Sequence, residues 1–202
     1  MKQLLRFLLI VTCFCTRSSY AQQVLLEPSY IAPSGYYSYL LKPGVLTELS
    51  YKIGFFNGKV NVGLSLGYTV LQPTKDTFRT YGWASGTFEP GYEVIHAYRI
   101  LAIGVPIEYV PLHNRRVSPV AGCDFYFYIL EIAEDDYTQN VGQYYTTGDN
   151  FWLEALCPHV GVQYKINDQC IVTSGLGRSI SFNGTTYSQA FWKTYISIAY
   201  VL

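Results

Sequence analysis

A strict alternation of apolar residues with small or polar residues over positions 60–70 constrains this chain more than any other feature. One set of positions holds Val60, Val62, Leu64, Leu66, Tyr68 and Val70, and the other holds Asn61, Gly63, Ser65, Gly67 and Thr69. Successive side chains of a β-strand point to opposite faces, so a period of two predicts a strand with one apolar face. The segment therefore favours an all-β fold.

The same alternation recurs along the chain and arranges itself into hairpins. Residues 48–55 alternate in this way, and Asn57-Gly58, a preferred pair for a two-residue type I′ turn, separates them from residues 60–70. Two further hairpins are predicted, 101–109 with 120–129 and 156–166 with 170–180, and a closing strand covers 192–202. Residues 35–41 (GYYSYLL) are taken as the eighth strand.

Connection lengths alternate between short and long. Residues 57–58, 111–116 and 167–168 form short connections, whereas residues 72–93 and 131–150 are long, polar and interpreted as loops. Short turns at one end and long loops at the other are typical of outer-membrane barrels, whose short turns face the periplasm. The sequence thus predicts a transmembrane up-and-down antiparallel β-barrel of about eight strands, with both termini in the periplasm.

Composition indicates which face meets lipid. Charged residues make up 14% of the chain, against about a quarter in ordinary soluble domains. The non-apolar faces carry Gly, Ser, Thr, Asn and Tyr with isolated charges, which suits a crowded polar lumen. Lipid also requires every backbone polar group to be paired within the protein, which a closed barrel achieves. We therefore expect the apolar positions to face outward.

Three residues test this arrangement. Glu154 falls on the lipid-facing parity, so we place it above the membrane, near an outer loop. Pro106 and Pro158 lie inside strand patterns, and because proline cannot donate to the ladder, each is predicted to mark a bulge.

The first 21 residues have the pattern of an export signal. Lys2 and Arg6 flank the start of an apolar run, and Ala21 ends a small-residue site. This predicts a signal peptide over residues 1–21 and a barrel domain over residues 22–202. The alternative is a lipoprotein anchored at Cys13 or Cys15. The remaining cysteines, Cys123, Cys157 and Cys170, are interpreted as small strand residues, although one pair can oxidise in the envelope.

Residue spacing gives little sign of chemistry. His96, His113 and His159 each stand alone, so we expect no catalytic residue, cofactor or metal site. A net charge of zero gives no basic footprint for nucleic acid. One hypothesis is sharper: Lys52, Glu108 and Asp124 share the inward parity and are expected to form a polar cluster in a plugged lumen.

Two segments resemble a known family. Residues 99–109 (RILAIGVPIEY) and 118–129 (SPVAGCDFYFYI) resemble the porin-family or PorT-like outer-membrane barrels of Bacteroidota, and Gly161-Val162 and residues 195–202 also look like that family. Members often end in Phe, whereas this chain ends in Leu202. The resemblance implies an outer-membrane barrel without shared catalytic residues. It permits a role in secretion, adhesion or surface assembly.

We therefore expect a non-enzymatic barrel in the cell outer membrane that works through its outer loops or by docking. Its expected partners are outer-membrane lipid and other envelope proteins. Two alternatives remain open: a secreted, soluble lipocalin-like barrel that binds a small apolar ligand, and a barrel-embedded lipid-modifying enzyme. The enzyme would need a Ser or Asp against a His on the outer part of the wall.

Overall fold

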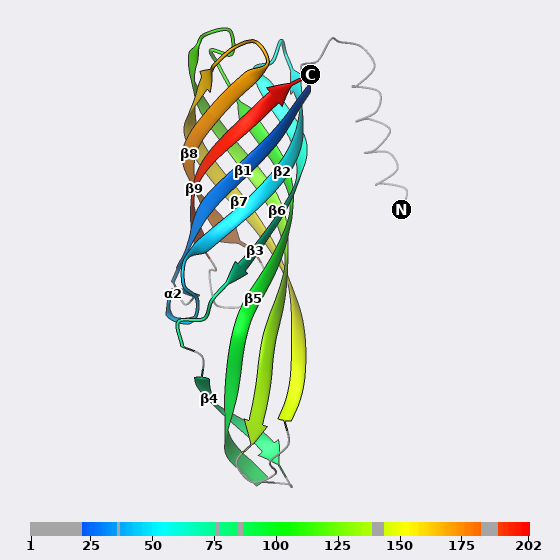
Figure 1. The fold of residues 1–202 in the computed structure, drawn as a ribbon, viewed down its shortest axis with the longest axis vertical. Coiled ribbons are helices and arrows are strands. Elements are labelled where there is room, and N and C mark those ends of the chain that lie inside the picture. The colour runs from blue at the N-terminus through cyan, green and yellow to red at the C-terminus, as the bar shows by residue number, and fades with distance from the viewer. Residues whose placement is uncertain (1–21, 36, 76, 85–86, 139–143, 183–189) are drawn as a thin grey trace, which may run out of the picture.

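The chain forms a closed antiparallel β-barrel with an extension at one end (Figure 1). The computed structural model describes residues 22–35, 37–75, 77–84, 87–138, 144–182 and 190–202. Eight strands close the barrel: β1 (Gln22–Ser34), β2 (Gly44–Phe55), β3 (Val60–Leu71), β5 (Thr87–Tyr109), β6 (Val117–Thr138), β7 (Tyr144–Lys165), β8 (Cys170–Ser181) and β9 (Ala190–Val201). The pairings β1–β9 and β3–β5 complete the ring. The predicted eight-stranded, up-and-down barrel is confirmed.

The short turns and the C-terminus lie at the same end of the barrel (Figure 1). We name this the periplasmic end, following the orientation usual for such barrels, and the opposite end the outer end. The turn between β2 and β3 is centred one residue earlier than predicted. Gly58 N donates to Phe55 O (3.0 Å), and the intervening Phe56 and Asn57 have the positive φ values that a type I′ turn requires.

The first strand is not the predicted one. Residues 35–41 do not form a strand along their length; they contain the short helix α2 (Tyr37–Leu40), and β1 precedes it. The inward positions of β1 include Leu25 and Ile31, so apolar residues occur on both faces. The alternation is therefore blurred, and Glu27 and Pro28 obscure it further. The predicted signal peptide, residues 1–21, lies outside the described residues.

The two predicted long loops are also largely strand. β5, β6 and β7 contain 23, 22 and 22 residues and continue past the rim of the barrel. They are joined there by β4 (Thr77–Ala84), which pairs with β5 from Thr77↔Val94 to Ala84↔Thr87. The outer parts of β4–β7, here called the outer extension, stand well beyond the rim (Figure 1). Strands that pair with one another beyond the rim satisfy their backbone groups there, and no lipid boundary requires their sequences to alternate.

The prolines interrupt single ladders but shift no register, so the predicted bulges are wrong. Pro106 stays paired with Asp124 of β6, and Pro158 stays paired with Cys123 of β6. On the other side of each proline, two residue pairs are missing from the ladder with β3 or β8, and pairing then continues in the same register. A missing N–H affects only one neighbour. The described register shift falls instead at Ile95/Ala97.

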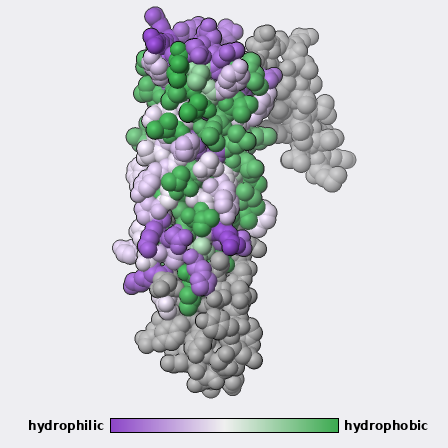
Figure 2. Space-filling view, in the orientation of Figure 1, coloured by the Kyte–Doolittle hydropathy of each residue, from purple (hydrophilic) through white to green (hydrophobic). Residues whose placement is uncertain are grey.

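The barrel is apolar outside and polar in the middle of its interior. Leu64 and Leu66 are 66% and 55% exposed, whereas Asn61 and Ser65 are 3% and 6% exposed. Figure 2 shows hydrophobic residues gathered between two hydrophilic ends. This inversion contradicts the soluble lipocalin-like alternative, because a soluble barrel hides its apolar face. Among the described residues, no helix has the length and apolar character needed to cross a membrane.

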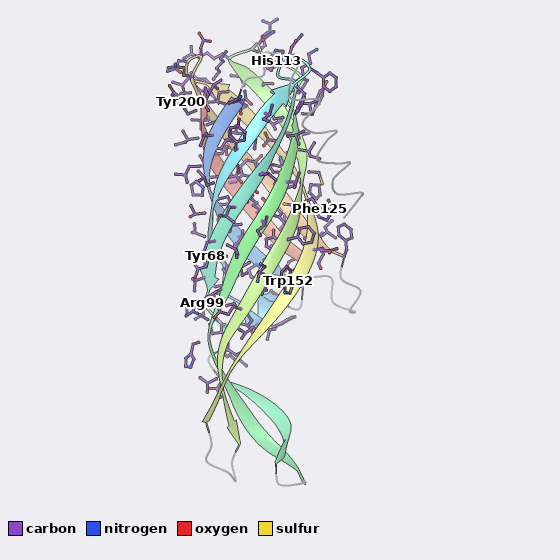
Figure 3. All side chains as sticks on the ribbon, turned by 90° about the vertical axis from the view of Figure 1, so that its right-hand side faces the viewer. Tyr68, Arg99, His113, Phe125, Trp152 and Tyr200 are labelled. Atoms are coloured by element: carbon purple, nitrogen blue, oxygen red, sulfur yellow. The ribbon has the colours of Figure 1, made fainter. Side chains whose placement is uncertain are left out.

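Exposed aromatic residues mark both edges of the belt. Tyr200 lies near the periplasmic end, and Tyr68 and Trp152 lie toward the outer end (Figure 3). Such girdles are usual where a barrel wall meets the two membrane interfaces. Glu154 has the predicted outward parity and is half-buried. Its carbonyl accepts a hydrogen bond from Phe182 N (3.0 Å), just beyond the outer end of β8.

Candidate functional site

Charged side chains from several strands meet in the middle of the lumen. Lys52 on β2 and Glu108 on β5 form a direct ion pair, with Lys52 Nζ 2.6 Å from Glu108 Oε1. Strand β3 lies between them, and its Gly63 pairs with Lys52. A Cβ at Gly63 would lie 2.9 Å from Lys52 Cγ. The absent side chain therefore leaves room for Lys52 to reach across β3.

Asp124 joins this pair through a histidine. His159 Nδ1 lies 3.5 Å from Asp124 Oδ2, and His159 Nε2 lies 3.8 Å from Glu108 Oε1. Gly122 makes space for the imidazole, since a Cβ there would lie 2.4 Å from His159 Nε2. The structure thus brings Lys52 and Glu108 together directly, and Asp124 through His159.

A second group of charges centres on Lys193 of β9. Lys193 Nζ forms ion pairs with Glu27 (2.7 Å) and with Glu48. Tyr126 lies between the two groups: its hydroxyl is 2.8 Å from Glu48 Oε1 and 3.2 Å from Asp124 Oδ2. The single hydroxyl proton is therefore best placed for Glu48. Lys193 Nζ donates to the same hydroxyl oxygen at 3.0 Å.

Together these residues make one connected network, here called the ion-pair cluster: Glu27, Glu48, Lys52, Glu108, Asp124, Tyr126, His159 and Lys193. It holds four carboxylates and two lysines, so its carboxylates outnumber its lysines by two. Buried charges are tolerated only when they are paired and hydrogen-bonded. The cluster is therefore suited to fixing the strands around it.

The lumen toward the outer end is filled by apolar side chains. We call this group the apolar plug; its members include Ile31, Leu46, Leu71, Ile100, Leu130, Leu153 and Phe191. The cavities in the plug and in the cluster measure about 20 Å³ and about 10 Å³. Each is about the space of a single water molecule. As expected for an eight-stranded barrel, side chains fill the described lumen at the level of the cluster and of the plug.

Two connecting segments, residues 40–42 and 72–74, contact each other at the outer end of the apolar plug. Leu41, which follows α2, bridges to Pro73 and is only 1% exposed. Lys42 N donates to Gln72 O (2.8 Å), and Thr74 N donates to Leu40 O (2.7 Å). These contacts hold the two segments against each other at the rim beside β3.

The sequence hypothesis named three members of the cluster and missed five. Glu48, Tyr126, His159 and Lys193 share the inward parity of their strands, so parity alone is a signal that could have found them. Glu27 was missed because β1 was not predicted. Parity does not give the height of a residue along the barrel, and height decides which charges meet.

Comparisons with known proteins identify the fold. No protein-family model matches the sequence, and no curated protein matches it significantly. Among solved structures, the chain is similar to Neisserial surface protein A (10% identity, 92% of this chain and 98% of that one, TM-score 0.58). It is also similar to OprG from Pseudomonas aeruginosa (9% identity, 90% and 96% covered, TM-score 0.53). A third match is the N-terminal β-barrel domain of Pseudomonas aeruginosa OprF (9% identity, 91% and 100% covered, TM-score 0.51).

At such low identities the likeness concerns the fold alone. The class of protein is nevertheless clear from the closed eight-stranded ring, the outward apolar belt and these matches. The chain is a small outer-membrane β-barrel, embedded in the outer membrane by its lipid-facing strands.

Proposed function

We propose that this barrel is a non-catalytic surface-binding protein that mediates adhesion through its outer extension. The observation that carries the proposal is the outer extension itself. Four strands continue as a paired sheet beyond the rim of the closed barrel (Figure 1). A membrane anchor alone does not require this length.

The outer extension has two free edges among the described residues. Residues 78–84 of β4 pair with β5 only, and residues 144–151 of β7 pair with β6 only, since β7 begins to pair with β8 at residue 155. Unpaired strand edges present rows of N–H and C=O groups to solvent. An extended segment of another protein can add to such an edge as a further strand. The proposed partner is therefore a surface protein that offers an extended segment.

The filled lumen supports a binding role over a transport role. The ion-pair cluster and the apolar plug lie one after the other along the barrel, and their cavities are too small for a sugar. Liposomes containing the protein are expected to swell in sugar solutions no faster than empty liposomes. Swelling at the rate of a general porin would contradict this.

The enzyme alternative receives no support from the arrangement of His159. Its imidazole is enclosed in the lumen between Asp124 and Glu108, away from the lipid-facing wall. Purified protein incubated with envelope lipids is expected to leave their masses unchanged. A modified lipid would contradict the non-catalytic role.

Membership of the PorT-like family remains part of the proposal and rests on residues 99–109 and 118–129. Nucleic acid is not an expected partner.

The decisive experiment shortens the outer extension and keeps the barrel. In β6–β7, residues 134–147 are replaced by Asn-Gly, which joins the pair Ala133↔Gly148. In β4–β5, residues 77–94 are replaced by a short glycine-serine linker. Cells with the wild-type gene, the shortened gene or no gene are compared for adhesion to one another and to protein-coated surfaces.

The shortened barrel is expected to adhere as poorly as the strain without the gene. Heat-modifiable gel mobility serves as the control that it still folds and inserts. Full adhesion by a folded, shortened barrel would overturn the proposal.

A further inference from the structure

A wide cavity opens at the periplasmic end, opposite the outer extension. It measures about 520 Å³. Its polar lining comes from β1, from two turns and from β3 and β7, and consists mainly of Gln23, Asn57, Asn61, His113, Asn114 and Gln163. Figure 3 shows His113 at this end of the barrel. We call this cavity the periplasmic cup. Its inner side adjoins the ion-pair cluster, because the lining residue Asn61 is paired with Glu108 across the β3–β5 ladder.

The lining is rich in side-chain amides and carries little free charge. Each amide offers both a hydrogen-bond donor and an acceptor. The charged lining residues Lys165 and Asp168 are paired with each other at 3.0 Å. Ile171 and Val201 add an apolar strip on one side. The cup therefore fits a ligand that is uncharged, carries several hydrogen-bonding groups and has one apolar face.

Two polar atoms in the cup have unused hydrogen-bonding capacity. Asn61 is 3% exposed, and its Oδ1 has no hydrogen-bond partner in the described structure. The Nδ1 atom of His113 is buried and likewise unpartnered there. A buried polar atom without a partner is destabilising, and a bound ligand that supplies a partner removes this cost.

We propose that the periplasmic cup binds a neutral N-acetylated sugar of one or two rings. The acetamido group supplies an N–H and a C=O that match side-chain amides, the hydroxyls match His113 and the remaining amides, and the carbon face of the ring fits the apolar strip. The volume lies within the range of small-molecule sites, about 300–1,000 Å³.

Two other ligand classes fit less well. A short peptide with free ends would present charged termini to the cup, whereas Lys165 and Asp168 already neutralise each other. An anionic ligand would approach a cluster with more carboxylates than lysines. A compact, neutral ligand avoids both conflicts.

The test uses the purified protein in micelles of a detergent without a sugar headgroup, titrated with N,N′-diacetylchitobiose by calorimetry. Saturable binding with a Kd of about 1 mM or lower is expected. Gln163→Leu and, separately, the exposed Asn114→Ala are each expected to weaken binding by about tenfold, as loss of one or two hydrogen bonds implies. Gln169→Ala is the matched control, since Gln169 is an exposed amide at the same end that does not line the cup. Heat-modifiable mobility verifies that each variant is folded.

Three results would overturn the proposal. The first is no saturable binding of the disaccharide up to about 10 mM, and the second is binding that neither cup variant weakens. The third is equal or tighter binding of cellobiose, which lacks acetamido groups, or of a terminally blocked dipeptide. The second result would place the ligand elsewhere, and the third would show that the cup selects a different class of ligand.

Discussion

The two parts of the filled lumen are built by the same strands but are held together by different forces. On β2, Leu46 belongs to the apolar plug, whereas Glu48 and Lys52 belong to the ion-pair cluster. On β6, Leu130 belongs to the apolar plug and Asp124 belongs to the ion-pair cluster. Close packing stabilises the plug, whereas the cluster depends on every charge keeping its partner. The comparison suggests that the plug contributes stability and the cluster contributes register.

Register follows from the sequence distances that the cluster spans. Lys193 and Glu48 are 145 residues apart, and Tyr126 and Glu48 are 78 apart. A one-residue slip in a strand moves every inward side chain to the lipid face. For β9 or β2 a slip would place a charge in lipid and leave its partner unpaired. Apolar plug residues would incur no such penalty in lipid.

The largest effect is expected when one charge of the cluster is removed. Lys193→Met leaves Glu27 and Glu48 without their shared cation, so the free energy of unfolding is expected to fall by about 3–5 kcal/mol. This loss of unfolding free energy is measured by urea unfolding in lipid vesicles, with gel mobility reporting the folded fraction.

A matched triple variant separates the charge from the side-chain volume. Lys193→Met combined with Glu27→Gln and Glu48→Gln removes the whole group of charges and is expected to recover much of the loss. A single variant as stable as the wild type would show that the cluster is not the charge-dependent half of the lumen.

A somewhat smaller effect is expected in the plug. Leu130 is 5% exposed, and Leu130→Ala leaves a cavity that costs about 3 kcal/mol of unfolding free energy. The same unfolding assay applies. Sugar permeability is expected to stay at the background level, because the ion-pair cluster still blocks the lumen. Sugar entry through this variant would show that the plug alone closes the barrel.

Overpacking of the ion-pair cluster is expected to lower the unfolding free energy by less than Leu130→Ala does. In Gly122→Ala the new Cβ lies 2.4 Å from His159 Nε2 and 2.6 Å from Ile107 O, so the side chain and the wall must both shift. A loss of about 1–3 kcal/mol is expected. The control is Ala121→Val on the lipid-facing side of the same strand, where space is open. Equal effects of the two changes would argue against tight packing around His159.

The smallest effect on stability is expected for an ion pair in the lining of the periplasmic cup. Lys165 pairs with Asp168, whose side chain is 98% exposed. Solvent screens such a pair, so Lys165→Met is expected to change the unfolding free energy by less than about 1 kcal/mol. A loss as large as that of Lys193→Met would mean that burial is not what distinguishes the two lysines.

Individual strands show how far sequence reasoning reached. In β3 and β9 the alternation is clean, and both strands were predicted along nearly their whole length. In β1 both faces carry apolar residues, so the strand was missed and residues 35–41 were chosen wrongly. In the outer extension the strands lack the alternation that a lipid boundary imposes, so they were interpreted as loops.

The amino-acid sequence by itself determined the class of fold and the direction of its faces. The period of two, the scarcity of charge and the short connections at one end are local properties, and lipid on one side of the wall leaves a clear mark on them. Tertiary structure alone decided which charges pair, how far the strands extend and that a cup opens at the periplasmic end. These features depend on the position of each residue along the axis of the closed barrel. That position is set by pairings between strands that are far apart in the chain.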